Sequence, residues 1–342
     1  MKNARVFFSV AAIALLLAAA SCGGQATPLS RTDFVLWTTC TVTLYDHAEQ
    51  GTLDAVFDRL HEIHNRLSVN IPESELDAVS AAAGRTAVHV TDDVFYVIKE
   101  ALRYSALSDG LFDPTVGPLM KAWKMNTEEG HIPAPADIAR ALSLVNWRDV
   151  VMDDSAKTIY VKRPGMSLDA GGVLKGYAAD ETARILASRG VKSAMIDLGG
   201  NILAMGSKPD GSPWRIGLQD PDSERGISFG TVGVVDKSVV TSGVYEHFFM
   251  QNGKRYHHIM DTRTGYPVEN GLVAVTVISK SSIDADGWDT TLLCMGPSRG
   301  LAIAKTLGLD AILVSSNHKL YATDSAKKML TITDPTFTYA VP

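Results

Sequence analysis

Residues 257–267 read HHIMDTRTGYP and form the most informative segment of the chain. Two imidazoles, a carboxylate, a guanidinium and two threonine hydroxyls lie close together here, and a buried strand could not hold so many polar groups without partners. Thr264 to Pro267 have the composition of a tight turn, in which Gly265 can adopt a positive φ. We therefore expect His257 and His258 to end a strand and the polar residues to form a loop at its mouth. A polar hairpin with surface histidines is the alternative at this point.

The pattern of elements around this segment predicts an α+β protein, built as one large domain or two interlocked ones. Apolar residues at helical spacing predict helices over 52–67, 92–107 (with Thr91 as N-cap), 137–144, 173–188, 285–295 and 301–307. Alternating or β-branched runs predict strands over 35–45, 158–161, 167–169, 193–196, 202–205, 214–218, 228–236, 239–241, 245–251, 272–278, 310–315 and 319–322. Helices and strands mix without the regular β-α-β alternation of a Rossmann fold.

The N-terminus has the features of a secretory signal. Lys2 and Arg5 precede a largely apolar run over 6–20, which is shorter than the roughly 20 residues that a membrane span needs. Small residues then precede Cys22, as in the lipobox of bacterial lipoproteins. We therefore predict a signal peptide over 1–21, a lipid on Cys22, a tether over 22–31 and a folded domain over 32–342.

Composition excludes some other functions. The net charge of −6 argues against nucleic acid as a partner, because nucleic acid selects basic surfaces. Cys40 and Cys294 stand in largely apolar surroundings and are expected to be buried free thiols. His61 and His64 are three residues apart on a predicted helix, but no further ligand near them would complete a metal site, so we expect them at the surface or its boundary.

Residues 167–177, SLDAGGVLKGY, suit an anion. A predicted strand delivers Asp169, two glycines allow close backbone approach, and a helix begins that carries Lys175. Helix N-terminal amides and a lysine together can bind a phosphate. The spacing is not that of a Walker A loop, and Gly176 stands where that motif has Ser or Thr. A plain turn is the alternative.

Residues 282–291, SIDADGWDTT, are rich in oxygen ligands at the start of a helix. Asp286 and Thr290 are four residues apart and share one face. Clustered oxygens suit Mg²⁺, which usually keeps water ligands and shares substrate phosphates. The alternative is that Asp284 caps the helix while the other acids face solvent.

Two further segments are less specific. Residues 107–119 contain two prolines and two glycines, so they form an irregular loop that is either structural or a binding loop. Residues 240–245 place hydroxyls and a glycine between two strands, where they could bind a phosphate or simply turn the chain.

Together these segments resemble the ApbE-like FAD:protein FMN transferases, also called flavin transferases. The resemblance extends from about Trp37 to Val314. It rests on motifs of the expected order and spacing, namely Ser74-Glu75-Leu76, 109–115 (DGLFDPT), Asp169 with Gly171-Gly172, Lys175-Gly176-Tyr177, 197–201 (DLGGN), 241–245 (TSGVY), His258-Ile259 with Asp261 and Thr264-Gly265, and Ala285-Asp286 with Thr290.

The resemblance implies a mixed sheet with packed helices, related to the T-fold, and site residues with defined roles. His258 is implied as the catalytic base, and Mg²⁺ as the cofactor, held by Asp286, Thr290 and a backbone carbonyl near Gly172, with Asp284 and Asp289 as extra acids that could join it. The implied contacts of the substrate FAD are Trp37, Asn70, Leu111, Phe112, Asp113, Asp169, Lys175, Thr241, Ser242 and Ile259.

The implied reaction moves FMN from FAD to a Thr or Ser hydroxyl of an acceptor protein and releases AMP. Acceptors of the family are flavoprotein subunits of membrane redox complexes, so we expect a lipid-anchored enzyme at the periplasmic face of the inner membrane. One departure stands out, because Asn70 replaces an aromatic residue that the family commonly has. A more open site would also let water hydrolyse FAD to FMN and AMP. The alternatives are therefore an FAD pyrophosphatase and a non-catalytic flavin-binding lipoprotein.

Overall fold

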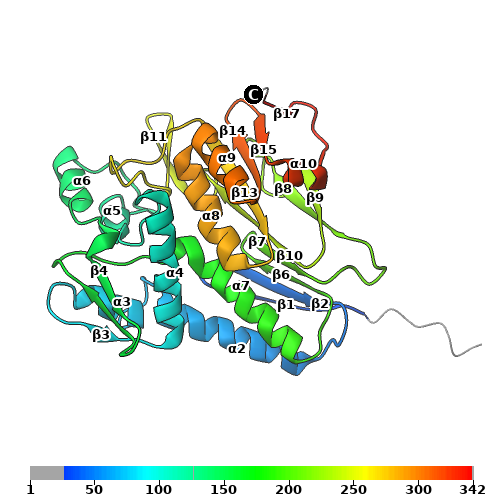
Figure 1. Cartoon of the computed structure of the whole chain (residues 1–342), viewed down its shortest axis with the longest axis horizontal. Helices are drawn as coiled ribbons and strands as arrows, with labels where there is room; N and C mark the ends of the chain where they lie inside the picture. The colour runs from blue at the N-terminus through cyan, green and yellow to red at the C-terminus, as the bar shows by residue number, and fades with distance from the viewer. Residues whose placement is uncertain (1–26, 126, 341–342) are drawn as a thin grey trace, which may run out of the picture.

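The computed structural model describes residues 27–340 except residue 126 (Figure 1). The helices are α2 (Gln50–Leu67), α3 (Glu75–Ala81), α4 (Asp92–Ser108), α5 (Gly117–Ala122), α6 (Pro135–Leu142), α7 (Gly171–Ser188), α8 (Ser282–Met295), α9 (Pro297–Thr306) and α10 (Asp324–Met329). The strands are β1 (Leu29–Val35), β2 (Thr38–Leu44), β3 (Val88–His89), β4 (Val150–Asp153), β5 (Thr158–Val161), β6 (Ala194–Leu198), β7 (Asn201–Met205), β8 (Trp214–Gln219), β9 (Ser228–Val234), β10 (Lys237–Gly243), β11 (Phe248–Gln251), β12 (Lys254–His257), β13 (Leu272–Ser279), β14 (Asp310–Ser315), β15 (Lys319–Ala322), β16 (Leu330–Ile332) and β17 (Thr338–Tyr339).

A nine-stranded sheet forms the centre of the molecule, in the order β1-β2-β6-β7-β10-β13-β14-β15-β17. Neighbouring strands are antiparallel except for β15 and β17. Three small sheets accompany it, β16-β9-β8, β3-β5-β4 and β11-β12. This arrangement confirms the predicted α+β class.

The two faces of the central sheet bury different partners. One face packs against α2, α7 and α8 through residues such as Val42, Ile196, Val240 and Val275. The other face packs against β8, β9 and β16 in a second apolar cluster that includes Val239. Because successive strand residues point to opposite faces, β10 contributes to both layers and directs Ser242 toward the helices.

A third cluster lies beside the sheet, where α5 and α6 pack against the β11-β12 hairpin and the loop that follows it. Leu119, Trp123, Ile138 and Met260 form its buried part. The Trp123 indole donates to the Gly265 carbonyl oxygen at 2.9 Å, so this cluster holds the turn of the HHIMDTRTGYP segment.

Several predicted bounds differ from the structure by a few residues, and three differences change the course of the chain. The predicted strand 35–45 is the second arm of the β1-β2 hairpin, because Leu36 and Trp37 both adopt positive φ and turn the chain. Residues 29–31, expected in the tether, therefore belong to the sheet. Residues 167–169 form no strand; they are an irregular segment whose Asp169 amide donates to the Pro114 carbonyl oxygen.

The remaining N-terminal predictions, the signal peptide and Cys22, lie outside the described residues. Within residues 27–340, no helix combines the length and apolarity that crossing a membrane would require. Cys40 and Cys294 are buried free thiols, as predicted, and burial raises the pKa of each to about 12.

Candidate active site

Helices α7 and α8 meet at Gly176, and this contact builds the floor of the site. A Cβ at Gly176 would lie 2.4 Å from the Ser282 carbonyl oxygen and 2.5 Å from Ile283 Cα, so only glycine permits the approach. The Gly176 amide then donates to Asp286 Oδ2 at 2.8 Å. The second turn of α7 thereby fixes a carboxylate of α8.

Two buried carboxylates form the acidic part of the site. Asp286 and Asp289 are 4% and 1% exposed. Burial raises the pKa of Asp286, and burial together with the charge of Asp286 raises that of Asp289 well above its usual range. Asp289 Oδ1 accepts from the amide and hydroxyl of Thr290, whereas Asp289 Oδ2 is buried and accepts no hydrogen bond from any described residue. A buried anionic oxygen without a donor is costly unless a cation is bound.

Hydroxyls extend this acidic group toward the sheet. Thr290 Oγ1 lies 2.8 Å from Ser242 Oγ on β10. Thr241, the neighbouring residue, instead lies 2.8 Å from the Thr276 hydroxyl on β13, on the other face of the strand. The structure thus places Ser242 beside the acids and turns the Thr241 side chain, a predicted FAD contact, to the other face of the sheet.

The N-terminal turn of α7 lies next to the acids. Gly172 is in contact with Phe112, since a Cβ there would lie 2.6 Å from the Phe112 ring. Asp169 Oδ1 accepts from the Gly171 amide at 2.8 Å, and burial raises the pKa of this carboxyl. The positive charge of Lys175 lowers the pKa of both Asp286 and Asp289 and so opposes the effect of burial. The ammonium group of Lys175 therefore lies close enough to act on both carboxyls.

His258 follows the last residue of β12, as the sequence predicts. Its Nδ1 lies 3.2 Å from the His247 carbonyl oxygen, which also accepts from the His258 amide. If Nδ1–H donates this hydrogen bond, Nε2 carries the lone pair. Burial and the neighbouring His247 lower the pKa of His258 to about 3, and the charge of Lys175 contributes to the shift. The imidazole is therefore neutral at pH 7 and able to accept a proton.

His257 is the last residue of β12. Its ring is buried, and Nε2 lies 3.0 Å from the Val268 carbonyl oxygen, which ties β12 to the end of the loop. His247 stands edge-on to His258, with ring centroids 5.2 Å apart. Sequence reasoning missed His247, because it read the residues around it as part of a strand.

Trp37 and Asn70 come together through Ser68. The Trp37 indole donates to Ser68 Oγ at 2.8 Å, and the backbone N–H of Asn70 donates to the same oxygen at 3.2 Å. Trp37 is half exposed at the turn of the β1-β2 hairpin, with its ring 5.6 Å from that of His64. An aromatic face is thus available beside the position where the family has its own aromatic residue.

Two other predicted side chains are engaged elsewhere. Asp284 accepts from Arg103 and Tyr104, both at 2.5 Å, so its carboxylate is paired away from the predicted metal group. Asp113 is buried and accepts from the Trp147 backbone amide and from Thr115, so its carboxylate holds the loop over 107–119 in shape. The side chains of Leu111, Phe112 and Ile259 are also buried, which leaves them as walls of the site.

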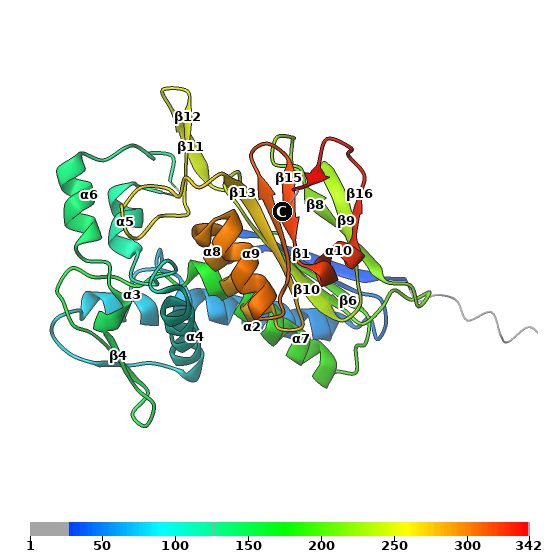
Figure 2. The ribbon, with the colours of Figure 1, turned by 45° about the horizontal axis from the view of Figure 1, so that its top comes forward.

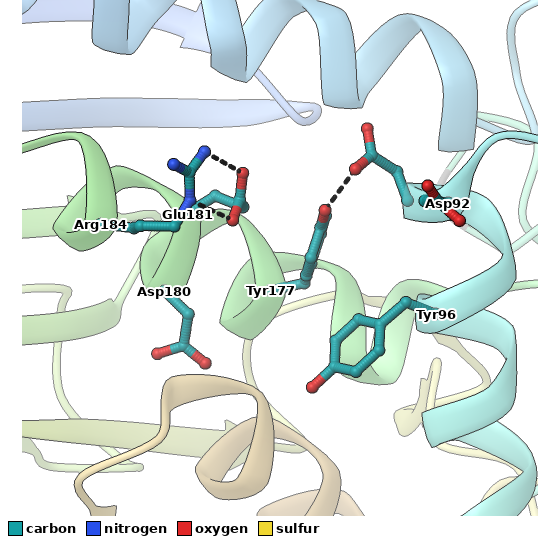
Figure 3. A pocket seen from close by; sticks show the side chains of 7 residues that line it. Asp92, Tyr96, Tyr177, Asp180, Glu181 and Arg184 are labelled. Carbon is teal, nitrogen blue, oxygen red and sulfur yellow. Dashed lines mark hydrogen bonds and ion pairs between the residues drawn. The ribbon is translucent and has the colours of Figure 1, made fainter.

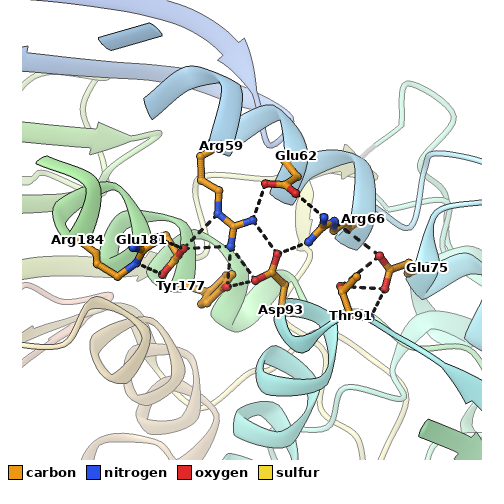
Figure 4. A network of polar contacts seen from close by, with 9 residues as sticks. All are labelled: Arg59, Glu62, Arg66, Glu75, Thr91, Asp93, Tyr177, Glu181 and Arg184. Carbon is orange, nitrogen blue, oxygen red and sulfur yellow. Dashed lines mark hydrogen bonds and ion pairs between the residues drawn. The ribbon is translucent and has the colours of Figure 1, made fainter. Parts of the chain in front are cut away.

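A polar network holds α7 in place behind the site (Figure 4). The Tyr177 hydroxyl donates to Asp93 Oδ1 at 2.6 Å, and Arg59 donates to both oxygens of Asp93 at 2.7 and 2.8 Å. Arg59 also binds Glu181 on α7, and thus joins three helices. Because the network ties α7 to α2 and α4, the position of Lys175 is set by the scaffold.

Two other features could be mistaken for the site. A cavity of about 410 Å³ opens beside Tyr177 (Figure 3), but its four acids are engaged. Asp92 pairs with Lys157, Asp93 with the network, Glu181 with Arg184, and Asp180 with amides at the start of α8. A second group lies where Asp220 and Asp222 follow β8 and His318 precedes β15. One oxygen or nitrogen atom from each of the three side chains lies within 4.8 Å of the others, and His318 Nε2 lies 2.8 Å from Asp222 Oδ2.

The chain is similar to proteins of known class over most of its length. The model of the ApbE family matches residues 36–313. An FAD:protein FMN transferase of Klebsiella pneumoniae is 37% identical over 81% of this chain and 86% of its own, and one of Treponema pallidum is 31% identical over 98% and 99%. The crystal structure of an ApbE protein from Thermotoga maritima covers 89% of this chain and 99% of its own, with 28% identity and a TM-score of 0.82. The chain belongs to the ApbE family.

Proposed function

We propose that this protein transfers FMN from FAD to a hydroxyl group of a protein acceptor, with release of AMP. The observation that carries the proposal is the convergence of a neutral histidine, a lysine and a buried acidic pair beside one helix N-terminus. The curated relatives that match the chain bear the name of this activity.

The donor set fits Mg²⁺. Asp286, Thr290 and a backbone carbonyl near Gly172 would hold the ion, and Asp289 offers a buried oxygen that no described residue satisfies. Oxygen donors of this kind suit a hard cation that retains water and substrate oxygens. When bound, the ion would neutralise the charge of the FAD diphosphate.

The chain's own residues account for the rest of the chemistry. His258 Nε2 accepts the proton of the acceptor hydroxyl, whose oxygen attacks the phosphorus on the FMN side of the diphosphate. The bond from that phosphorus to the bridging oxygen breaks, and AMP leaves with the bridging oxygen. Lys175 binds the diphosphate and stabilises its charge. The negative charge of a bound diphosphate would also raise the pKa of His258 above the value that burial and His247 impose.

Hydrolysis of FAD is a second candidate activity. Asn70 is exposed, and no aromatic side chain from that position closes the site. Water can then replace the acceptor hydroxyl in the same step and yield FMN and AMP.

We further propose that the enzyme is a lipoprotein anchored through Cys22 at the periplasmic face of the inner membrane. The lipobox-like sequence before Cys22 supports this. Its acceptors would be flavoprotein subunits of membrane redox complexes.

The test is mass spectrometry of a purified acceptor domain that contains a target threonine, after incubation with the protein, FAD and Mg²⁺. We expect covalent FMN on the acceptor, loss of the product by about 10²- to 10⁴-fold with His258→Ala, and none on an acceptor whose threonine is replaced by valine. Free FMN and AMP with an unmodified acceptor would instead establish a pyrophosphatase. Bound FAD without either product would leave a flavin-binding protein.

A further inference from the structure

The β11-β12 hairpin projects from the body of the molecule and has two different faces (Figure 2). On the inner face, Phe249 and Tyr256 stack on each other with ring centroids 5.4 Å apart, and both lie near Trp123. The inner face therefore belongs to the packed cluster around α5 and α6.

Beyond the buried His257 at its base, the outer face has no such cover. Phe248 and Met250 are 42% and 58% exposed, and Arg255, opposite Met250 in the hairpin, is exposed as well. These three residues are called the hairpin patch here. Exposed apolar side chains gathered on one projecting element are typical of interaction surfaces.

The charge in the hairpin patch is available to a partner. The Arg255 guanidinium lies 4.6 Å from the centre of the Phe248 ring and forms no ion pair with a carboxylate in the part of the chain that the structure describes. By contrast, its neighbour Lys254 is paired with Glu269. A partner that covers the patch would therefore combine apolar side chains with a carboxylate.

The hairpin is also joined directly to the catalytic position. His247 precedes β11 and His258 follows β12, and the His258 amide donates to the His247 carbonyl oxygen at 3.0 Å. Each arm has four residues, so the hairpin extends about 13 Å from this point. A protein that presents a hydroxyl to His258 brings further side chains within that distance, whereas a water molecule does not.

We propose that the hairpin patch is a docking surface for the protein acceptor and binds an apolar and acidic segment near the target hydroxyl. This inference rests on the proposed transferase function. It predicts that the patch contributes to recognition of the acceptor and not to FAD binding.

The test uses Met250→Asp and Arg255→Glu with the purified acceptor domain, FAD and Mg²⁺. Val151→Asp and Arg299→Glu, at exposed sites on β4 and α9, serve as matched controls for the two changes. For each patch variant we expect the KM for the acceptor, and the Kd of fluorescently labelled acceptor, to rise about tenfold or more. The kcat, the KM for FAD and the unfolding temperature should stay at the values of the controls.

Other outcomes would overturn the proposal in distinct ways. An unchanged KM and Kd for the acceptor would exclude docking at the patch, and a raised KM for FAD would assign the patch to the FAD site. Loss of a dimer in light scattering, or of binding to vesicles of anionic phospholipid, with acceptor affinity unchanged would assign it to self-association or to the membrane. If the wild-type protein binds the acceptor without flavinylating it, the transferase function fails while docking stands or falls on the measured Kd.

Discussion

Replacing Asp289 by Asn should make the metal-free protein more stable while weakening its binding of Mg²⁺. In the structure, Asp289 Oδ1 accepts from Thr290, but the buried Oδ2 has no donor and lies in the field of Asp286. An amide keeps the acceptor toward Thr290 and removes a buried charge. A buried group without a hydrogen-bond partner costs about 1–3 kcal/mol and more when it is charged, so we expect removal of the charge to give about 1–2 kcal/mol at pH 8.

The gain in stability should depend on pH, in a direction set by the raised pKa of Asp289. The pKa of Asp289 is raised in the folded state, so its carboxyl destabilises the fold as pH rises through that pKa and the charged form appears. At lower pH the carboxyl is protonated and resembles the amide. The difference between variant and wild type should therefore be largest at pH 8 and shrink as pH falls.

Magnesium should offset most or all of the variant's advantage. At a Mg²⁺ concentration 100 times the wild-type Kd, binding stabilises the wild type by about 2.7 kcal/mol, or roughly 5 °C in Tm for a chain of this size. Loss of a supporting group weakens metal affinity about 10- to 100-fold. At the same Mg²⁺ concentration, binding would then stabilise the variant by only about 0.4–1.4 kcal/mol.

The assay is thermal unfolding of wild type, Asp289→Asn and Asp284→Asn at pH 8, with EDTA and with Mg²⁺. Asp284→Asn is the matched control, because its carboxylate is engaged by Arg103 and Tyr104. The reasoning is refuted if Asp289→Asn lowers the Tm in EDTA and keeps the full Mg²⁺ shift.

Three further changes probe other parts of the site. Trp37→Ala should raise the KM for FAD about tenfold or more in steady-state kinetics, because it removes the exposed aromatic face; an unchanged KM would place the flavin elsewhere. Gly176→Ala should cost about 3 kcal/mol or more in urea unfolding, because its Cβ would overlap the Ser282 carbonyl oxygen and Ile283, and a loss under 1 kcal/mol would mean that the helices separate freely. In urea unfolding, the free energy of unfolding of His258→Asn should rise relative to that of the wild type by up to about 1.4 kcal/mol per pH unit as pH falls below 6.5. The reason is that His258 has a lowered pKa in the folded state, so the unfolded wild type binds a proton that the folded wild type does not. A difference that does not change with pH would contradict this.

The sequence predicted the elements well where one face of each element is apolar. Helices α2, α4 and α7 and most strands of the central sheet occur within a few residues of the predicted bounds. The β1-β2 hairpin was missed because its turn uses Leu36 and Trp37 with positive φ, in place of the usual Gly or Asn. Nothing in the local composition indicates such a turn, because the paired strands impose it.

What the sequence leaves open about the candidate site has one cause. Motif position names Lys175, Asp286, Thr290 and His258 as candidates, but it cannot tell which neighbouring side chains point toward them. Thr241 faces the other layer of the sheet, and Asp284 and Asp113 are engaged by partners far away in the sequence. Only the packing of distant segments decides those directions.

Three consecutive residues of α7 show how this packing connects chemistry to scaffold. Successive helical residues point about 100° apart. Lys175 acts on the acids and His258, Gly176 admits α8 and donates to Asp286, and Tyr177 binds Asp93 in the network with Arg59. A small displacement of α7 would therefore move the lysine and the carboxylate together. For this reason the Tyr177 hydroxyl is expected to act by positioning these groups, although it lies outside the reacting centre.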